Sequence, residues 1–311
     1  MAISRSDFTK QLIPGLHEII GLNYKSYENE HLALFDVYKS DRSFEEETLM
    51  TGFGEAPIKS EGTGVTFDDA QEAWTQRFSH DTIALAMSIT EEAIEDNLYD
   101  TQARLQAEAL GRALASTKQQ KAADVFNNGF NASYPLGDAK ALFADDHPLI
   151  NGSSLDNLTT ADLSETALEN AIIAIAGFKD DRGILINAQV KSLHIPVNLK
   201  FAAFQILKSD LSTTMHDNTA ADSVSNVNDV NALRSMGMFP KGVIVNHRFT
   251  DPERWFIRTD CPNGSKMFER TPLQISQEGD FTTGNLRVKA RERYSFGVTD
   301  PRQWYGSDGS A

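Results

Sequence analysis

Four side chains in the segment GDAKALFADDHPLINGS, residues 137–153, are of types that perform acid–base chemistry or bind metals. They are Asp138, Asp145, Asp146 and His147. An enzymatic interpretation makes His147 a general base oriented by Asp145 or Asp146, or a metal ligand together with them. Adjacent residues of extended chain point to opposite faces, so Asp146 and His147 serve one ion only if the loop bends sharply. The pattern favours a structural loop whose side chains bond to nearby backbone.

Searches for other catalytic or cofactor-binding motifs give no site. The remaining histidines form no HExxH motif, and no Cys/His zinc pattern is present. The phosphate-binding patterns GxGxxG and GxxxxGK[ST] and the nucleophile motif GxSxG are also absent. Cys261 is followed by proline in a predicted turn, and nothing nearby indicates a nucleophilic thiol. We therefore expect a protein without catalytic residues, metal ligands or a cofactor.

The composition restricts the class of protein. The 311 residues are 40% hydrophobic, enough to bury a substantial core in one large domain or two ordinary ones. A formal charge of −15 excludes a surface devoted entirely to nucleic acid, so any such contact must be regional. The single cysteine precludes an intrachain disulfide and fits a reducing compartment, the cytoplasm by default. Because no signal peptide and no apolar run near ~20 residues is present, we expect neither secretion nor a membrane span.

Residues 41–72 differ in composition from the rest of the chain. They contain four glycines and nine acidic residues, against only Arg42 and Lys59. Segments 44–52 and 63–67 are predicted as two short strands of a long two-stranded finger. Such a finger is marginally stable alone in water, so we expect something else to support it, a neighbouring subunit being one candidate.

A long helix is predicted over residues 90–127. Thr90 is its N-cap, acidic residues fill its first turns, and Lys118 and Lys121 lie toward its far end, as the helix dipole favours. Its length of about 37 residues corresponds to about 55 Å. A seam of alanines predicts packing on a flat partner such as a sheet. A coiled coil is the alternative, although the apolar residues do not sustain heptads.

The second half of the chain combines helices and strands. Ser164 or Thr166 is predicted to cap a helix that runs to Phe178. GILINAQVKSLHIP is predicted as a strand, VNLKFAAFQILKSD as a helix, and residues 242–245 as a short strand. No regular βαβ alternation occurs, so we predict an α+β fold.

The clearest strand is NLRVKARERYSFGVTD, in which apolar and basic residues alternate. Its basic face carries Arg287, Lys289, Arg291 and Arg293, and four like charges on one face favour an acidic partner. That partner is nucleic-acid phosphate or the finger of another copy, while a solvated face with counterions is the third alternative. The finger acids considered for this contact are Glu45, Glu46, Glu47, Glu55, Glu61, Asp68 and Asp69.

The order of these parts resembles the major capsid proteins of tailed bacteriophages, which have the Hong Kong 97 fold. YPLGDAKALFADDHPL, followed by INGSSLDNLTTADLSETALENA, looks like the segment after the spine helix in Mu-like major head subunits. RERYSFGVTDPRQWYGSDG is similar to their C-terminal run. The resemblance covers nearly the whole chain and supports the structural interpretation of the loop at His147.

The resemblance implies a division of the chain into named parts, and it implies their boundaries. The parts are an N-terminal arm (1–40), an extended loop (41–72), a peripheral domain that holds the spine helix 90–127 and part of the axial domain (73–209), an axial domain (210–280), and a C-terminal strand that returns to the peripheral domain and ends in a tail (281–311).

The resemblance also implies a function, that of a subunit that forms pentamers and hexamers closing into an icosahedral head around double-stranded DNA. The protein would be found in the virion after assembly in the host cytoplasm. The expected partners are further copies of itself, a separate scaffold protein because the N-terminal arm is short, a portal, decoration proteins and non-specifically contacted DNA. Lys59 joins the interface candidates. Some relatives crosslink a lysine to an asparagine, but no partner for Lys59 can be matched.

Two alternatives remain open at the level of the sequence. The first is an encapsulin-like cellular shell, which loads cargo enzymes instead of DNA. The second is a soluble hydrolase that uses the loop at Asp145, Asp146 and His147, and it predicts that His147→Ala abolishes activity.

Overall fold

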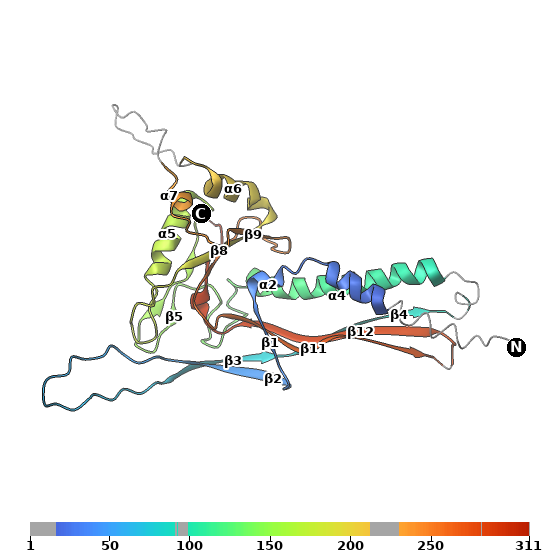
Figure 1. Ribbon diagram of the computed structural model, residues 1–311, viewed down its shortest axis with the longest axis horizontal. Coiled ribbons are helices and arrows are strands. Elements are labelled where there is room, and N and C mark those ends of the chain that lie inside the picture. Colours follow the sequence, from blue (N-terminus) through green and yellow to red (C-terminus); the bar gives the residue numbers. More distant parts are fainter. Residues whose placement is uncertain (1–16, 91, 93–98, 212–229, 281, 311) are drawn as a thin grey trace. The chain divides into compact units, whose positions relative to one another are not determined.

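The computed structural model describes residues 17–90, 92, 99–211, 230–280 and 282–310. The chain groups into two compact units, and each of them mixes helices with strands, as the α+β prediction requires (Figure 1). Unit 1 comprises residues 1–45, 78–122 and 267–296, and unit 2 comprises residues 46–77, 123–266 and 297–311. No helix within the described ranges is both long and apolar enough to cross a membrane.

Unit 1 is built on a four-stranded sheet in the order β1-β11-β12-β4. Its strands are β1 (Asp36–Lys39), β4 (Asp81–Ile89), β11 (Ser265–Gly279) and β12 (Leu286–Val298). In β12, buried and exposed residues alternate from Leu286 to Arg291, and the apolar members are the buried ones. The strand predicted from this alternation is therefore confirmed.

Helix α4 (Tyr99–Asn127) packs on the apolar face of this sheet. Ala107 and Leu114 are buried in one cluster with Val288. Residues 17–26 are also helical, and they pass so close to α4 that a Cβ added at Gly111 would lie 2.7 Å from the carbonyl oxygen of Ile20. A short helix, α2 (His31–Leu34), follows. The predicted long helix thus packs on a sheet and not in a coiled coil.

Parts of three predicted segments lie outside the described residues. They are residues 1–16 of the arm, residues 91 and 93–98 at the start of the long helix, and residues 212–229 of the predicted axial domain. The N-cap role of Thr90 therefore stays a prediction.

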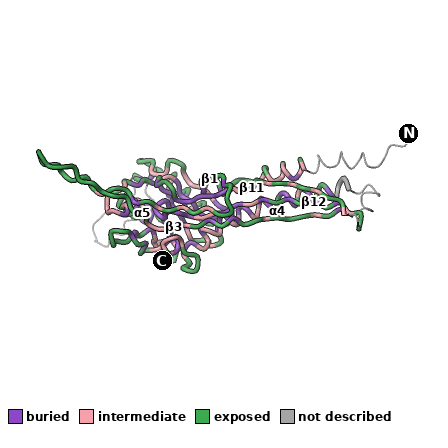
Figure 2. The backbone as a smooth tube through the Cα atoms, turned by 90° about the horizontal axis from the view of Figure 1, so that it is seen from below, coloured by how far each residue is buried: buried purple, intermediate pink, exposed green. Residues whose placement is uncertain are grey.

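The finger contains strand β2 (Phe44–Met50), which pairs with β3 (Glu72–Ser79). The strand predicted at 44–52 is confirmed, but the one predicted at 63–67 is wrong, because residues 51–71 contain no strand. Strand propensity depends on cross-strand packing, and Val65 and Phe67 have none, being 71% and 94% exposed. Figure 2 shows the tip of this excursion as exposed chain.

Unit 2 contains a five-stranded sheet in the order β7-β13-β10-β8-β9. Its strands are β7 (Leu158–Thr159), β8 (Val190–Pro196), β9 (Val243–Asn246), β10 (Trp255–Thr259) and β13 (Trp304–Ser307). β10 runs antiparallel to both of its neighbours, whereas the two outer pairs are parallel. The predicted strands around Pro196 and Val245 are confirmed in β8 and β9.

Helices cover one face of this sheet. They are α5 (Glu165–Ala176), α6 (Lys200–Lys208) and α7 (Ala232–Ser235), with the 3-10 turns η1 (Val197–Leu199) and η2 (Pro301–Gln303) nearby in the chain. Ser164 caps α5 as predicted, because its side-chain oxygen accepts a hydrogen bond from the backbone NH of Ala167. Leu168 and Ile175 of α5 and Ala203 of α6 are buried in the same apolar core as strand residues Leu193 and Ile257.

Aromatic rings form a second cluster in unit 2. Phe126, at the end of α4, has its ring centroid 4.6 Å from that of Trp304 and 5.5 Å from that of Phe256. Phe143 stacks on Phe256 at 5.2 Å, and Gly306 leaves room for it, since a Cβ there would lie 2.7 Å from the Phe143 ring. This cluster fixes the segment that leads to the short hairpin of β5 (His147–Pro148) and β6 (Ser154–Leu155).

Two strands join a sheet in a different unit from most of their predicted range, and the division into named domains stays a prediction. β11 lies within the predicted axial range 210–280, but it belongs to the four-stranded sheet of unit 1 beside β12. Conversely, β13 lies within the predicted range 281–311, but it pairs with β10 in unit 2. Pro272 obscures β11 in the sequence, because proline disfavours central strands. Pairings between strands that are distant along the chain leave no local signal.

Candidate interface surfaces

The outer face of the sheet in unit 1 carries the predicted basic stripe. Arg287, Lys289, Arg291 and Arg293 lie on one side of β12, opposite Ser88, Ala86, Ala84 and Thr82 of β4. Successive cations are about 6.8 Å apart along the strand, which is two residues of antiparallel rise. Because the facing β4 side chains are all small, the basic side chains of β12 extend beyond them. Together they form a low surface that another chain can approach.

The cations of this stripe differ in their partners. An Arg287 Nη2 lies 2.5 Å from Asp280 Oδ2. Arg293 donates at 3.4 Å to the carbonyl oxygens of His80 and Ser43. Within the described part of the chain, no ion pair involves Lys289 or Arg291, both of which are exposed. The middle of the stripe therefore carries unneutralised positive charge.

Three of the predicted finger acids already have partners in their own chain. Glu45 accepts a hydrogen bond from the Ser40 hydroxyl at 2.7 Å. Glu46 pairs with Arg77 at 3.8 Å. Glu47 pairs with Lys266 and accepts a hydrogen bond from the Thr299 hydroxyl at 3.1 Å. These glutamates of β2 anchor the base of the finger, and their charge is largely balanced within the chain.

Asp68 and Asp69 brace the point where the finger widens into its loop. Asp68 accepts a 2.7 Å hydrogen bond from the backbone NH of Gly54, which, with Arg182 nearby, lowers the pKa of its carboxyl group. An Arg182 Nη2 donates to the carbonyl oxygen of Asp69 at 2.5 Å and lies 3.6 Å from Asp68. Both residues therefore hold the loop in place, which the sequence did not indicate.

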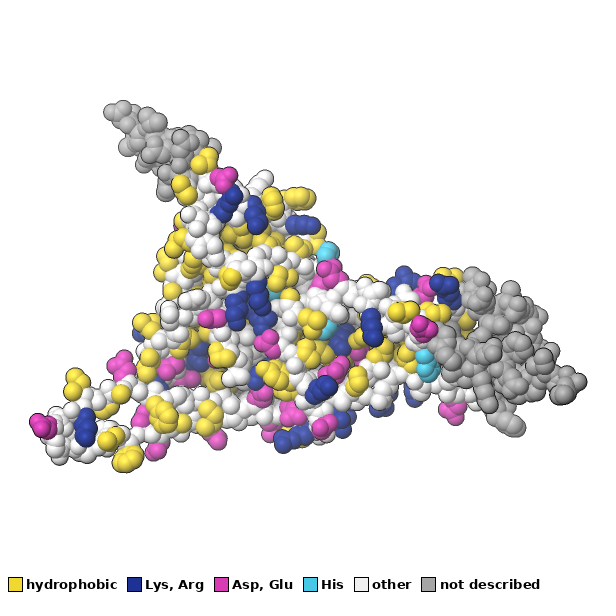
Figure 3. All heavy atoms as spheres, in the orientation of Figure 1, with side chains coloured by type: hydrophobic (Ala, Val, Ile, Leu, Met, Phe, Trp, Pro, Cys, Tyr) yellow, Lys and Arg dark blue, Asp and Glu magenta, His cyan; other side chains and the backbone are white. Residues whose placement is uncertain are grey.

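The tip of the finger is exposed and amphipathic. Glu55, Lys59 and Glu61 are exposed, and the described chain offers none of them an ion pair. Large apolar side chains accompany them, and these carry high exposed fractions. They are Phe53 at 64%, Ile58 at 98%, Val65 at 71% and Phe67 at 94%. Figure 3 shows hydrophobic side chains interspersed with acidic ones along the finger. The predicted interface included only the charged residues of this segment, although its apolar residues are equally visible in the sequence.

In the loop at His147, the histidine side chain is buried and paired within its own loop. His147 Nδ1 lies 2.5 Å from Asp138 Oδ2, and neither side chain has any solvent exposure. Asp146 instead pairs with Lys140, and Asp145 is exposed. The orientation of His147 by Asp145 or Asp146, which the enzymatic interpretation requires, is therefore not present, and the favoured interpretation as a structural loop agrees with these contacts. Among the residues with described side chains, no group of three His, Cys, Asp or Glu residues could hold a metal ion.

A buried polar cluster lies between α4 and the sheet of unit 1, and the sequence analysis did not predict it. Glu292 of β12 is 1% exposed and lies 3.4 Å from Lys118 Nζ. The Tyr24 hydroxyl donates to Glu292 at 2.8 Å and accepts from Lys118 at 3.0 Å. Burial raises the pKa of Glu292 more than Lys118 and Tyr24 lower it. The available signal was the position of Glu292, on the inward face of an otherwise apolar alternation.

The chain is similar to known proteins both in its sequence pattern and in its fold. A family model described as phage capsid protein matches residues 72–307. No curated protein sequence matches the chain. The capsid of a native GTA particle is 15% identical, with a TM-score of 0.57 over 92% of each chain. A virus-like particle from Pyrococcus furiosus is 10% identical, with a TM-score of 0.55 over 95% of this chain and 98% of that one.

The capsid of cyanophage P-SCSP1u gives a further match, at 12% identity and a TM-score of 0.54 over 88% of this chain and 86% of that one. At such low identities these matches establish the fold alone. The fold is the one expected from the resemblance, with its finger, its long helix on a sheet and its mixed α/β unit. The narrower likeness to Mu-like head subunits stays a prediction.

Proposed function

Because the chain belongs to the phage capsid protein family, we propose that its copies form pentamers and hexamers that close into the icosahedral head of a tailed phage around double-stranded DNA. The observation that carries this proposal is the family match over residues 72–307. The fold match across about nine-tenths of the chain supports it. The location that follows is the virion, after assembly in the host cytoplasm.

The finger of one copy would lie on the basic stripe of the next. Its exposed acids Glu55 and Glu61 match the unneutralised Lys289 and Arg291. Its apolar side chains can bury against the low surface of small β4 residues. Burial of a side chain such as Phe67 contributes roughly 1.5–3 kcal/mol, whereas an exposed ion pair contributes about 0–1 kcal/mol. Apolar contact would therefore supply most of the affinity, and the charges would set the register.

The same contact would give the assembly its geometry. The finger tip and the basic stripe are different surfaces, so the contact is head to tail and closes into a ring when the rotation between copies permits. A two-stranded element is marginally stable alone, so the neighbour would also order the finger. Lys59 at the tip would lie within this contact.

The proposal also includes partners other than copies of this chain. A separate scaffold protein, a portal and decoration proteins would act during head assembly. Contacts with the packaged DNA would be non-specific and regional, because the chain carries a formal charge of −15. An encapsulin-like cellular shell is the alternative within the same fold, and packaged cargo protein in place of DNA would favour it.

We further propose that the protein is not an enzyme. The hydrolase alternative needs His147 to meet a substrate, but its imidazole is fully buried and engaged with Asp138. His147→Ala should therefore lower stability or assembly and abolish no reaction. The family match to a capsid protein supports the same conclusion.

Truncation of the finger tests the assembly proposal. A variant in which residues 55–65 are replaced by a short glycine–serine linker retains both Gly54 and Asp68, whose hydrogen bond closes the loop base. We expect this variant to melt like the natural chain and yet to give no shells by negative-stain electron microscopy. Normal shells from the truncated chain would contradict the proposed role of the finger.

A further inference from the structure

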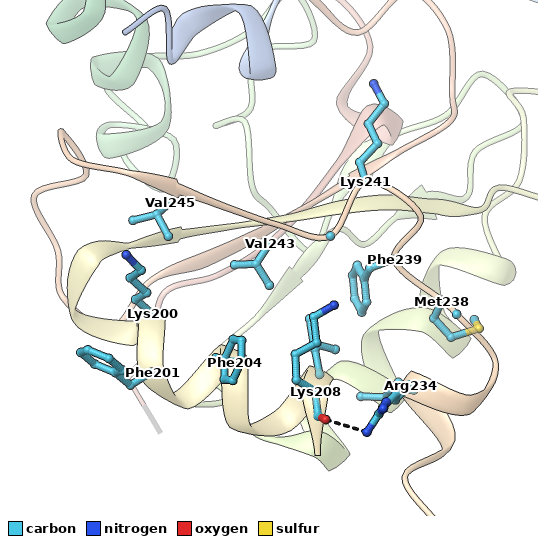
Figure 4. A pocket seen from close by; sticks show the side chains of 14 residues that line it. Lys200, Phe201, Phe204, Lys208, Arg234, Met238, Phe239, Lys241, Val243 and Val245 are labelled. Atoms are coloured by element: carbon cyan, nitrogen blue, oxygen red, sulfur yellow. Dashed lines mark hydrogen bonds between the residues drawn. The ribbon is translucent and has the colours of Figure 1, made fainter. Parts of the chain in front are cut away.

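Unit 2 contains an open groove of about 800 Å³ between α6, α7 and the edge strand β9 (Figure 4). Apolar side chains form its floor, including those of Phe204, Leu207, Leu233, Phe239, Val243 and Val245. Phe201 and Phe204 are 77% and 63% exposed, although they belong to a helix whose other face is core. Exposed apolar surface of this kind marks a binding site.

Basic side chains surround this floor. Figure 4 shows Lys200, Lys208 and Lys241 placed around Phe204 and Val243. The described residues provide no ion pair for any of these three lysines. Arg234 also lines the groove, but it is paired with Asp210 and donates to the carbonyl oxygen of Lys208 at 2.7 Å. The groove therefore suits an apolar surface that carries acidic groups.

A second surface of the same unit is formed by α5 and the segments around it. The groove borders β9, which is one edge of the five-stranded sheet, whereas β7 is the other edge and the chain enters α5 from it. The outward stripe of α5 contains Ile173, which is 70% exposed. Two acidic residues, Glu169 and Asp162, lie on this stripe or just before it, and neither forms an ion pair among the residues that are described.

Another element extends this second surface. The backbone NH of Asn151 donates to the carbonyl oxygen of Asp181 at 3.2 Å, which ties the β5–β6 turn to the hairpin after α5. Ile150 in that turn is 39% exposed, and Leu185 in that hairpin is 61% exposed. The α5 side of unit 2 thus carries apolar and acidic side chains, with the exposed Lys179 opposite Leu185 as a cation among them, while the groove is apolar and basic.

We propose that the groove receives the α5 side of a second copy of this chain. The two surfaces are different parts of one unit, and the acids of one match the lysines of the other, so the contact is head to tail and propagates from copy to copy around a ring. This inference rests on the proposed shell function and adds a ring contact separate from the finger.

Disulfide crosslinking tests the contact directly. In a Cys261→Ser chain, which has no other cysteine, we would introduce Phe204→Cys in the groove and Ile173→Cys on α5. Under mild oxidation, the double variant should give a ladder of dimers, trimers and larger species on a denaturing gel. Each single variant should stay below the trimer, because one cysteine per chain can join only two copies. Absence of a ladder from the double variant would overturn the proposal.

Charge exchange supplies the specific control. Lys200→Glu with Lys208→Glu should remove the ladder, and Glu169→Lys with Asp162→Lys in the same chain should restore it, with melting temperatures checked for every variant. A ladder without shells would count against the shell function and leave the groove contact standing. Shells without a ladder would overturn the groove contact and leave the shell function standing. Crosslinking of Phe204→Cys to an added scaffold protein instead would show that the groove has a different occupant.

Discussion

Glu292 of β12 and Lys118 of α4 form an ion pair of 3.4 Å in the interior of unit 1, where their side chains are 1% and 8% exposed. The Tyr24 hydroxyl bridges them, and Lys118 Nζ lies 5.1 Å from the ring centroid of Tyr294. The pair joins the long helix to the sheet beneath it. Its members are 174 residues apart in the chain.

Replacing one member of this pair should lower the free energy of unfolding much more than replacing both members by apolar residues. Lys118→Met leaves the Glu292 carboxyl buried without its cation, and we expect the free energy of unfolding to fall by about 3–5 kcal/mol. Lys118→Met combined with Glu292→Leu should recover most of that loss, because a well-packed apolar pair often matches a buried ion pair. Urea unfolding of the three chains measures this. A double variant no more stable than the single one would contradict the account.

Two buried histidines should make the protein sensitive to acid. Burial, followed by the charge of Lys118, lowers the pKa of His31 to about 4. Burial, followed by the charge of Arg258, lowers that of His194 to about 3. Below about pH 6.5 the two histidines become protonated in the unfolded chain, whereas in the folded chain they stay neutral until the pH approaches their lowered pKa values. Stability is thus full above that pH and falls as the pH drops toward these values, by about 1.4 kcal/mol per unit for each histidine.

Urea unfolding between pH 4 and pH 7 tests this prediction. His31→Gln places a side-chain amide where the imidazole Nδ1 of His31 now faces Gln119, and it removes the titration. We expect this variant to show a shallower loss of stability with falling pH than the natural chain. Equal slopes for the two chains would show that His31 does not titrate as proposed.

The apolar residues of the finger tip should matter more for assembly than its acids. Ile58→Ser with Phe67→Ser removes two side chains that are 98% and 94% exposed in the single chain, so the monomer should keep its melting temperature. Assembly into rings should be lost. The matched control, Glu55→Gln with Glu61→Gln, should assemble more slowly and with less dependence on salt. Sedimentation velocity compares the three chains, and the reverse ranking would contradict the prediction.

Reversal of charge in the middle of the basic stripe should block assembly without unfolding the chain. We choose Lys289→Glu with Arg291→Glu, because both side chains are exposed and have no ion pair within the described chain. Arg293 is a poorer choice, since its contacts with His80 and Ser43 stabilise its own chain.

A control for that reversal is Lys25→Glu, a single charge reversal at an exposed lysine at the end of the helical residues 17–26. The stripe variant should remain a folded monomer by circular dichroism and form no capsomers by native mass spectrometry, whereas the control should assemble. If the stripe variant assembles as readily as the control, the stripe is a solvated face.

Local patterns explain which elements could be predicted from the sequence. The strict alternation in β12, the run of helix formers in α4 and the cap at Ser164 each act within a few residues. β13 depends instead on partners far along the chain. β11 pairs with β12, the next strand in the sequence, and with the distant β1, but Pro272 masks it. The predicted strand at 63–67 failed because β propensity without a cross-strand neighbour does not specify a strand.

The candidate surfaces also differ in whether a local sequence pattern predicts them. The basic stripe followed from the two-residue period of β12 and lies where it was predicted. The pairing of His147 with Asp138 could not be predicted, because it depends on how the nine-residue loop folds under the aromatic cluster. The groove was also missed, because in the sequence Phe201 and Phe204 are indistinguishable from core residues of an amphipathic helix.

If copies of this chain build a shell, the purified chain should assemble when a candidate scaffold protein is added, and sedimentation with and without that protein, followed by negative-stain electron microscopy, measures this. We expect capsomer rings or closed particles of megadalton mass. A small oligomer that persists at high concentration with scaffold present would contradict it.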